Sequence, residues 1–475
     1  MPIQTLDLIY QGVTDFPEVD FAGTFDLEFT NDNPGTGGFW MVGYTYAAAD
    51  SFVTNNGLIS VYLSAQGNGD AVLLNNSTGT IGGGSPFGDG DVTGAITMSG
   101  SGTHLIANLG TMITNIQLGN GQDGIYNLSL LDGDVRMGGG DDYFVNDSST
   151  VIAGGLTGVV TGTVNMGSGN DVVLNASQMG RVNLGAGDDS YAAIHPGDVG
   201  NNFNNADAIA DRVSGGSGND TMYGGAGDDR FYGNDDDDVL NGHNGDDKLT
   251  GGNGNDRING GNDNDTLYGN QGEDLLNGGN QNDKLYGGDG HDRVNGGNHD
   301  DILYGGQGND TLNGGNHDDV LFGGDSKDTL NGGRGDDTLD GGNGEDLLTG
   351  GAGNDVMTGG SGADCFVFTG NSDADVITDF DVGADKVRLQ MGGEIFEDFY
   401  FGAYGDADVL SFVTYADGNA VLDLSGLYQS IPGENDFSDA NGISVTFLNV
   451  AEDSLTGDNF VTPEDYYPPF DLVLG

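Results

Sequence analysis

A strict period of nine residues constrains this chain more than any other feature of its sequence. From Gly215 to Val367 the chain runs through 17 consecutive nonapeptides, which begin with GGSGNDTMY and end with GGSGADCFV. Position one is Gly in all 17 units, position six is Asp, and position eight is apolar. A disordered acidic linker has no need to keep Asp and an apolar side chain in phase. We therefore expect a repeating fold over residues 215–367.

One nonapeptide predicts a turn followed by a short strand. Gly at positions one, two and four permits the left-handed or strained backbone angles of a tight turn. The last three residues, of pattern x-apolar-x, suit a strand that points one side chain inward. A single unit buries almost nothing, but two units would form one rung, and stacked rungs would share a thin core. Eight and a half rungs are expected from the 17 units, roughly 40 Å long at about 4.8 Å per rung.

The pattern GGxGxDx-apolar-x resembles the calcium-binding nonapeptide of the RTX family. This resemblance implies an all-β fold, a parallel β-roll, in which turn carbonyls and position-six Asp side chains of successive turns share Ca²⁺. The residue chemistry agrees, because Ca²⁺ takes about six to eight oxygen ligands from carboxylates and carbonyls. Residues 215–367 hold 31 acidic and 7 basic residues, a net charge of −24 that bound Ca²⁺ would neutralise. The predicted metal ligands are Asp220, Asp229, Asp238, Asp247, Asp256, Asp265, Asp274, Asp283, Asp292, Asp301, Asp310, Asp319, Asp328, Asp337, Asp346, Asp355 and Asp364.

Several units depart from the consensus at positions two and four. Position two is Asn234, His243 or Asn270 in three units, and position four is not Gly in six units. Asp and His tolerate a positive φ angle better than Gln or Ser does. The six residues at position four are Asp236, Asp263, Gln281, His299, His317 and Ser326. Four of them, from Asp263 to His317, are spaced by 18 residues, so we predict one edge of the roll that binds calcium less tightly or with altered ligands.

Position nine also alternates with a period of 18 residues. Tyr or Phe occupies it in four alternate units, and Asn occupies it in six units of the other series. The aromatic residues are Tyr268, Tyr286, Tyr304 and Phe322, and the amides are Asn241, Asn259, Asn277, Asn295, Asn313 and Asn331. We interpret both series as outward-facing ladders that stabilise the stacked strands. The alternative is an aromatic stripe that docks another domain, a second copy or a glycan. A transition-metal site at His299 and His317 is a further alternative.

The sequence on either side of the repeats predicts three more regions. Residues 368–475 are predicted to be the cap of the roll and a secretion region. The segments ADCFVFTGNSDADVITDFDVGADKVRL (363–389), which begins in the last nonapeptide, and GNAVLDLSG (418–426) resemble the roll-closing and C-terminal segments of RTX proteins. This resemblance implies an uncleaved C-terminal signal for type I secretion. Residues 113–214 repeat an alternating strand and a Gly-rich acidic turn, which predicts a degenerate extension of the solenoid with weak calcium sites. The residues of these weak sites are Asp141, Asp142, Asp171, Asp188 and Asp189. Alternation in TFDLEFT and LISVYLS predicts β structure in residues 1–112, a region to which we assign no role.

The overall composition limits the binding partners and the cellular location expected for the protein. A net charge of −63 makes nucleic acid and anionic membranes poor partners and cations good ones. One cysteine, Cys365, excludes an intramolecular disulfide framework. The N-terminal sequence lacks the basic and apolar regions of a Sec signal peptide, and no apolar run of about 18 residues predicts a membrane-spanning helix.

We find no sequence motif for catalysis. Neither HExxH nor GxSxG occurs, and GNGQDG (119–124) is interpreted as a turn because no helical pattern follows it. His104 and Arg136 are interpreted as satisfied surface residues rather than as a base and a cation of an active site.

The sequence predicts a secreted, extracellular or cell-surface protein whose repeats fold on binding Ca²⁺. Its predicted role is structural, surface-associated or adhesive, with the type I secretion machinery as a partner. A second copy of the chain and a cell-surface glycan are further candidate partners. The alternative is an extracellular carbohydrate-active or glycan-binding protein whose active part lies in residues 1–214, with the roll as its secretion and folding module.

Overall fold

A computed structural model describes residues 28–31, 39–46, 51–55, 58–66, 71–75, 80–82, 95–109, 111–146, 158–176, 178–193, 210–369, 373–391, 394–395, 413–416, 419–423, 444–450, 454–455 and 459. The chain divides into a first unit, Met1–Gly260, and a second unit, Gly261–Gly475, each of which is described by itself. Strand β25 (Arg257–Asn262) contains the point of division. The described residues form strands and turns without an α-helix, so no helix among them could cross a membrane.

The first unit contains two parallel sheets, and the chain passes from one sheet to the other as it advances. Strands of sheet IA are β1 (Glu28–Asn31), β3 (Ser51–Asn55), β5 (Ala71–Asn75), β8 (His104–Asn108), β11 (Gly124–Asn127), β14 (Tyr143–Asn146), β17 (Val172–Asn175), β19 (Ser190–Ala193), β21 (Thr221–Ala226) and β23 (Val239–Asn244). Strands of sheet IB are β2 (Phe39–Tyr46), β4 (Leu58–Gln66), β6 (Thr80–Gly82), β7 (Ala95–Ser99), β9 (Thr111–Ile113), β10 (Asn115–Gln117), β12 (Leu130–Asp132), β13 (Val135–Gly139), β15 (Val159–Val160), β16 (Val164–Ser168), β18 (Arg181–Ala186), β20 (Arg212–Ser217), β22 (Arg230–Asp235) and β24 (Lys248–Asn253).

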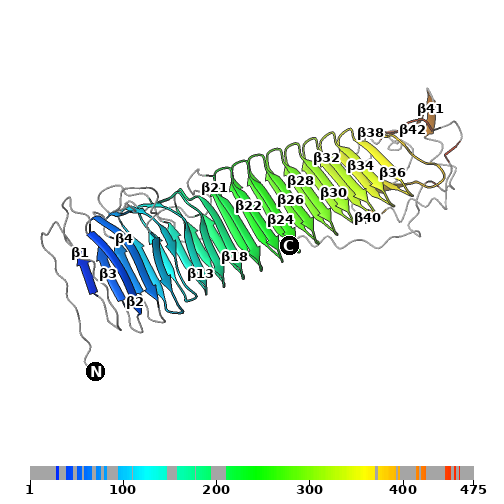
Figure 1. Cartoon of the computed structure of the whole chain (residues 1–475). Coiled ribbons are helices and arrows are strands. Elements are labelled where there is room, and N and C mark those ends of the chain that lie inside the picture. Colours follow the sequence, from blue (N-terminus) through cyan, green and yellow to red (C-terminus); the bar gives the residue numbers. More distant parts are fainter. Residues whose placement is uncertain are drawn as a thin grey trace, which may run out of the picture. The chain divides into compact units, whose positions relative to one another are not determined.

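The same turn-and-strand rule continues upstream of the nonapeptides, with rungs of unequal length. Phe144 pairs with Ile125 in the preceding rung and with Val173 in the following rung. The number of residues between paired positions differs, because some rungs contain residues inserted between their strands. Ile125, Phe144 and Val173 are fully buried, as are the position-eight residues further along. Strands β1 and β4 lie in the two segments whose alternation predicts β structure (Figure 1).

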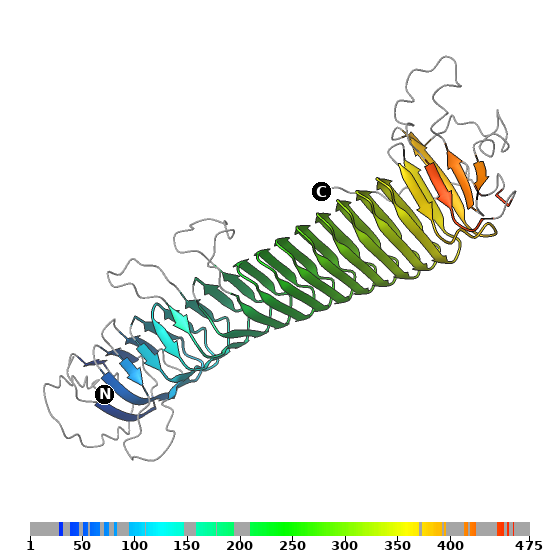
Figure 2. The same ribbon diagram turned by 90° about the horizontal axis from the view of Figure 1, so that it is seen from above.

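The second unit stacks its strands in two parallel sheets with a fixed offset of 18 residues until the repeats end. Sheet IIA contains β27 (Leu275–Asn280), β29 (Arg293–Asn298), β31 (Thr311–Asn316), β33 (Thr329–Arg334), β35 (Leu347–Ala352), β37 (Cys365–Thr369) and β39 (Lys386–Met391). Sheet IIB contains β26 (Thr266–Gln271), β28 (Lys284–Asp289), β30 (Ile302–Gln307), β32 (Val320–Asp325), β34 (Thr338–Asn343), β36 (Val356–Ser361) and β38 (Ala374–Ile377). Figure 2 shows the strands of this unit as a regular series.

The position-eight side chains form the core of the repeats, as the nonapeptide pattern predicts. In the second unit they are Leu267, Leu276, Leu285, Val294, Leu303, Leu312, Leu321, Leu330, Leu339, Leu348, Met357 and Phe366. None of them is more than 2% exposed. The all-β class and the parallel β-roll are therefore confirmed, whereas the predicted domain boundaries at residues 112, 214 and 367 stay predictions.

Antiparallel strands and an aromatic cluster end the second unit. Strand β43 (Ser444–Phe447) pairs in parallel with β38 and then antiparallel with β42 (Asn419–Asp423), which pairs with β41 (Val413–Ala416). Strand β40 (Glu394–Ile395) turns back antiparallel on β39. Phe380 packs 5.0 Å from Phe447 and 6.0 Å from Phe366, measured between ring centroids. These rings cover the last apolar layer of the roll, which a solenoid needs at its end.

Candidate metal centre

The position-six Asp residues form columns along the turns, one carboxyl group per rung. Each lies directly before a strand and is at most 2% exposed. In the turns within each unit one carboxyl oxygen, Oδ1, accepts the backbone N–H of the Asp one rung earlier on the same edge. The N–H of Asp310 donates to Asp328 Oδ1 over 2.8 Å, and that of Asp319 donates to Asp337 Oδ1 over 2.8 Å. The backbone thus fixes both the position and the orientation of each carboxyl group.

The second unit contains two such columns, one on each edge. The IIA column precedes the strands of sheet IIA and consists of Asp274, Asp292, Asp310, Asp328, Asp346, Asp364 and Asp385. The IIB column precedes the strands of sheet IIB and consists of Asp265, Asp283, Asp301, Asp319, Asp337, Asp355 and Asp375. The final members, Asp385 and Asp375, lie beyond the nonapeptides and do not follow from the period of nine.

The first unit continues this arrangement on the turns before sheets IA and IB. The IA column consists of Asp123, Asp142, Asp171, Asp189, Asp220, Asp238 and Asp256. The IB column consists of Asp211, Asp229 and Asp247. Sequence reasoning missed Asp123 and Asp211. The signal for Asp123 was available, because GNGQD (119–123) places Gly, Gly and Asp at the spacing of positions two, four and six.

The second carboxyl oxygen of these residues, Oδ2, is buried and makes no hydrogen bond in many turns of both units. It is so in Asp220, Asp238, Asp292, Asp301, Asp310, Asp319, Asp328, Asp337, Asp346, Asp355 and Asp364. A buried oxygen without a partner is costly unless a proton or a cation compensates it. Loss of hydration on burial accordingly raises the pKa of Asp319 and of Asp328 to about 8, and that of Asp337 to about 7. Ionised carboxyl groups in these columns are therefore unfavourable on their own, and a bound cation would stabilise them.

The glycine pattern surrounds each Oδ2 atom with backbone. A Cβ atom on Gly341 would stand 2.6 Å from Asp346 Oδ2 and 2.7 Å from the carbonyl oxygen of Gly359. The φ angles of the position-one glycines are not positive, so the prediction that they serve a strained turn angle is wrong. They are glycines because the Asp carboxyl group and the carbonyl of the next rung occupy the space of a side chain.

Positions two and four, in contrast, do require a left-handed backbone. All nine residues that replace Gly there, in either unit, have φ angles between 69° and 89°. They are Asn234, Asp236, His243, Asp263, Asn270, Gln281, His299, His317 and Ser326. This conformation is unfavourable for a residue with a Cβ atom and natural for Gly. The turn geometry is therefore kept in every unit, including those that depart from the consensus.

The donor set of these turns fits Ca²⁺. Among the described residues no three His, Cys, Asp or Glu side chains cluster around one point, so a metal shell built from side chains alone is absent there. Each turn instead offers one carboxyl group together with backbone carbonyls. Oxygen-only shells that mix carboxylates and carbonyls suit Ca²⁺ and not the transition metals that prefer nitrogen or sulfur ligands.

The predicted column of position-four substitutions is present on the IIB edge. The N–H of Gln281 donates to His299 Nδ1 and the N–H of His299 donates to His317 Nδ1, each over 3.3 Å. The two imidazole rings are stacked, with centroids 4.9 Å apart and an angle of 3° between their planes. Parallel rings do not aim their nitrogens at a common point, so this geometry favours a stacking role over a shared transition-metal site.

Position nine forms the two predicted ladders on the outer faces of the second unit. On sheet IIB the rings of Tyr268, Tyr286 and Tyr304 stack with centroids 4.8 Å apart, and Phe322 follows Tyr304 at 4.9 Å. On sheet IIA the side-chain amide of Asn313 donates to Asn295 Oδ1 over 2.7 Å. Ring faces in the ladder cover one another, so mainly ring edges meet the solvent.

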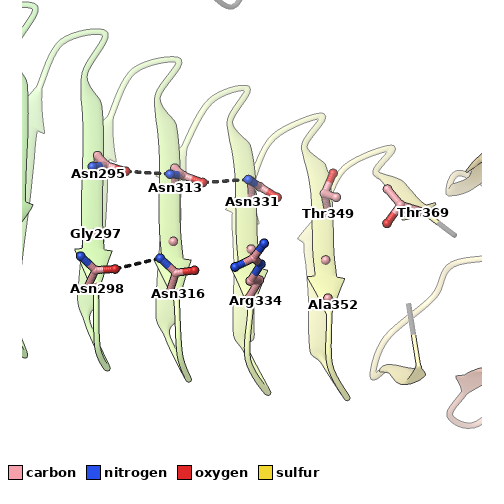
Figure 3. A pocket seen from close by; sticks show the side chains of 13 residues that line it. Asn295, Gly297, Asn298, Asn313, Asn316, Asn331, Arg334, Thr349, Ala352 and Thr369 are labelled. Atoms are coloured by element: carbon pink, nitrogen blue, oxygen red, sulfur yellow. Dashed lines mark hydrogen bonds between the residues drawn. The ribbon is translucent and has the colours of Figure 1, made fainter. Parts of the chain in front are cut away.

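A polar groove of about 580 Å³ lies between two amide ladders of sheet IIA (Figure 3). The second ladder is formed at position three, where the amide of Asn316 donates to Asn298 Oδ1 over 2.9 Å. Position-two glycines such as Gly315 line the groove between the ladders, and Arg334 and then Ala352 follow the amides in the position-three row. None of the residues lining the groove is a carboxylate, although the chain carries a net charge of −63.

The structure separates the five residues that the sequence assigned to weak upstream sites. Asp142, Asp171 and Asp189 belong to the buried IA column, whereas Asp141 and Asp188 are at least partly exposed at position five. Asp141 Oδ1 instead accepts the N–H of Asn170 over 3.0 Å. His104 is 1% exposed and its Nδ1 lies 2.8 Å from Asp123 Oδ1, so it cannot meet a substrate together with the exposed Arg136.

Comparison with known proteins identifies the repeats. A family model described as the RTX calcium-binding nonapeptide repeat, in four copies, matches in overlapping windows. The windows are residues 206–240, 232–267, 241–276, 268–303, 277–312, 295–330 and 331–365. No curated protein matches the chain.

Two of the solved structures that the chain resembles are bacterial. One is the extracellular lipase LipA from Serratia marcescens, at 19% sequence identity and a TM-score of 0.21, where the match covers 42% of this chain and 40% of the lipase. Another is the AlgE6R3 subunit of the mannuronan C5-epimerase from Azotobacter vinelandii, at 26% identity and a TM-score of 0.23. That match covers 34% of this chain and 88% of the subunit.

Proposed function

Because its nonapeptides make this chain a member of the RTX calcium-binding repeat family, we propose that it is a secreted protein whose roll folds on binding extracellular Ca²⁺. The proposed ligands are the 17 position-six Asp side chains from Asp220 to Asp364, completed by turn carbonyls. In this proposal the folded roll has a structural, surface-associated or adhesive role.

The observation that carries this proposal is the row of buried Oδ2 atoms without hydrogen-bond partners in turns such as those of Asp310, Asp328 and Asp346. Without a cation these carboxylates repel one another and lack water, so the roll is expected to be largely unfolded at low calcium. Since the sites do not exist in the unfolded chain, calcium binding energy becomes folding energy. A chain that unfolds in a low-calcium cytosol suits export through a narrow channel.

Sedimentation velocity of the full-length chain during a calcium titration tests the proposal. We expect a compact particle to replace an expanded one as calcium rises to about 10 mM, which spans weak extracellular affinities. The same titration with Mg²⁺ is the control, because Mg²⁺ demands a smaller octahedral site. A chain that stays expanded at 10 mM Ca²⁺, or one that is compact in chelator, would contradict calcium-coupled folding.

Export by the type I secretion machinery is part of the proposal. It is supported by the C-terminal segments that resemble those of secreted RTX proteins, including the β38–β43 region that closes the roll. Deletion of residues 368–475 is expected to retain the protein in cells that carry a type I exporter, whereas the full chain reaches the medium. Equal export of both forms would place the signal elsewhere.

The groove between the Asn ladders favours adhesion to a hydroxyl-rich polymer as a second candidate role. Each ladder amide uses one N–H and one oxygen lone pair along the ladder, which leaves one of each for a ligand. Binding of a neutral glucan oligosaccharide by the calcium-loaded protein, measured by calorimetry, tests this role. We expect Asn313→Ala combined with Asn316→Ala to abolish binding. Unchanged binding would place any glycan site elsewhere, such as in residues 1–214.

A further inference from the structure

Four turns upstream of the nonapeptides share positions two, four and six with the repeat turns. Their position one differs, because a buried apolar residue replaces Gly there: Leu118, Met137, Met166 or Leu184. Each follows the pattern G-x-G-x-D, in which the two glycines and the Asp correspond to positions two, four and six. These upstream turns are Gly119–Asp123, Gly138–Asp142, Gly167–Asp171 and Gly185–Asp189. The family model begins to match only at residue 206, so it does not cover them.

The carboxyl groups of the upstream turns are buried, and only one of the two oxygens in each accepts a hydrogen bond. Asp142, Asp171 and Asp189 are at most 2% exposed. The N–H of Asp142 donates to Asp171 Oδ1 over 2.8 Å, and that of Asp171 donates to Asp189 Oδ1 over 2.7 Å. In each of the four upstream turns the Oδ2 atom is buried and makes no hydrogen bond. This is the arrangement found in the repeats, and a buried carboxylate oxygen of this kind needs a proton or a cation.

Backbone carbonyls lie close to the neighbouring turn along the same edge. A Cβ atom on Gly167 would overlap the carbonyl oxygen of Gly138, and one on Gly185 would overlap that of Gly167. These glycines have φ angles of 117° and 125°, which a side chain would make unfavourable. Each of these turns thus contains both backbone carbonyls and one carboxyl group, the two kinds of oxygen that Ca²⁺ takes as ligands.

The opposite edge of the same rungs is built without any need for a cation. Buried Asn side chains form a ladder there, in which the amide of Asn127 donates to Asn146 Oδ1 and that of Asn146 donates to Asn175 Oδ1, each over 2.9 Å. An amide is both donor and acceptor, so such a ladder satisfies itself. The ladder ends where the amide of Asn175 donates to Asp211, the first residue of the IB column. The two edges therefore differ in chemistry until the nonapeptides begin.

A histidine ends the IA column on its N-terminal side. GSGTH (100–104) repeats the turn pattern with His104 in place of Asp. The N–H of His104 donates to Asp123 Oδ1 over 2.8 Å, as the N–H of each Asp does to the next in the column. Its Nδ1 atom lies 2.8 Å from the same oxygen. The imidazole contacts the oxygen that the backbone N–H already reaches, and Asp123 Oδ2 remains without a hydrogen-bond partner. His104 brings no carboxylate of its own, so the row of acidic ligands ends at Asp123.

We propose that the first unit binds Ca²⁺ at the four upstream turns, on one edge only, and that His104 closes this row so that no calcium binds beyond Asp123. The inference rests on the proposed function, because it extends calcium binding from the nonapeptides into residues 119–189. It makes the upstream segment a calcium-dependent part of the roll rather than an independent domain.

Equilibrium dialysis of the full-length protein against radioactive Ca²⁺ at saturation counts the bound ions. Asp142→Asn combined with Asp171→Asn keeps the Oδ1 acceptor and the side-chain size, and we expect it to bind at least two fewer ions than the unmodified chain. The matched control is Asp141→Asn with Asp188→Asn, which removes the same charge from neighbouring exposed residues and should leave the count unchanged. Asp319→Asn with Asp337→Asn tests the repeats in the same assay.

The outcomes separate the inference from the proposed function. If the repeat variant loses ions and the Asp142 and Asp171 variant does not, the upstream sites are refuted while calcium binding by the nonapeptides stands. If neither variant loses ions, both proposals fail. Since a loss could also arise from misfolding, His104→Asp provides a test by gain. It restores G-x-G-x-D at residues 100–104 and should bind one additional ion, and an unchanged count would refute the capping role of His104.

Discussion

The Oδ2 atom of Asp346 lies 2.6 Å from the place that a Cβ atom on Gly341 would take. The two residues belong to one turn, at positions six and one of the same nonapeptide. This relationship recurs through the nonapeptides and explains why position one is Gly in all 17 of them, although its backbone angles are ordinary. The buried carboxyl group and the missing side chain are thus two aspects of one constraint.

We predict that Gly341→Ala lowers the free energy of unfolding in calcium by about 1–3 kcal/mol, because overpacking forces the carboxyl group or the strand aside. It should also raise the calcium concentration at the folding midpoint. Urea unfolding at saturating calcium, followed by circular dichroism, measures the first effect. Gly383→Ala is the control, since the nearest atom to its Cβ is Asp381 Oδ1 at 3.2 Å. Equal stability of Gly341→Ala and the unmodified chain would refute the steric account.

Ser326 has a φ angle of 87°, which places it in the backbone region natural for Gly. We predict that Ser326→Gly raises the free energy of unfolding by about 1 kcal/mol, because removing the Cβ atom relieves a left-handed conformation. Ser217→Gly is the matched control, because Ser217 is an exposed strand residue without a positive φ angle. There the added flexibility should cost about 0.5–1 kcal/mol. A loss of stability in both variants would show that Ser326 is not strained.

The features of this fold that could be predicted from the sequence are those in which one residue type serves a single structural purpose. Leu303 and Leu312 had to be buried because no other position of their units is reliably apolar, and both are fully buried. Asp310 and Asp319 had to lie in turns, since Gly-rich segments precede them. Period, strand direction and the ladders at position nine followed from the same repetition.

The rest of the candidate site depends on neighbours in space that sequence spacing does not reveal. Asp375 joins the IIB column across an interval of 20 residues and Asp385 joins the IIA column across 21, so a search with a fixed period loses both. The interpretation of His104 as a surface residue is wrong, since it is buried against Asp123, which lay in a segment interpreted only as a turn. The role of position one was misjudged because a steric requirement and a φ requirement select the same residue, Gly.

The two edges of the second unit are predicted to bind calcium with different affinities. On the IIB edge His299 and His317 stand at position four and accept backbone N–H groups through Nδ1, whereas the IIA edge has Gly290 and Gly308 there. Larger residues in a left-handed turn make the shape of the site harder to attain. We expect calorimetry to resolve two classes of site, and His299→Gly with His317→Gly to shift ions from the weaker class to the stronger. A single class in the unmodified chain would refute the difference.

Calcium binding to chains that are already folded should release protons near neutral pH. Loss of hydration raises the pKa of Asp301 to about 8 and that of Asp337 to about 7, whereas Asp in an unfolded chain has a pKa of about 3.9. Without calcium the folded roll therefore binds more protons than the unfolded chain between pH 4 and about 8. Since protons favour the folded state over this range, the stability of the calcium-free roll should rise as the pH falls from about 8 towards 4 and be lost as the pH rises again.

The same linkage makes protons and calcium compete for the columns of the folded roll, so the apparent calcium affinity of the folded state should be lower at pH 6 than at pH 8. Calorimetric titrations in two buffers of different ionisation enthalpy measure the protons released per ion bound. We expect release at pH 7 and almost none at pH 9, where the carboxyl groups are already ionised. Asp319→Asn with Asp337→Asn should reduce the release, because each variant side chain has no proton to give up. Heats that are independent of the buffer at pH 7 would show that the columns are ionised before calcium arrives.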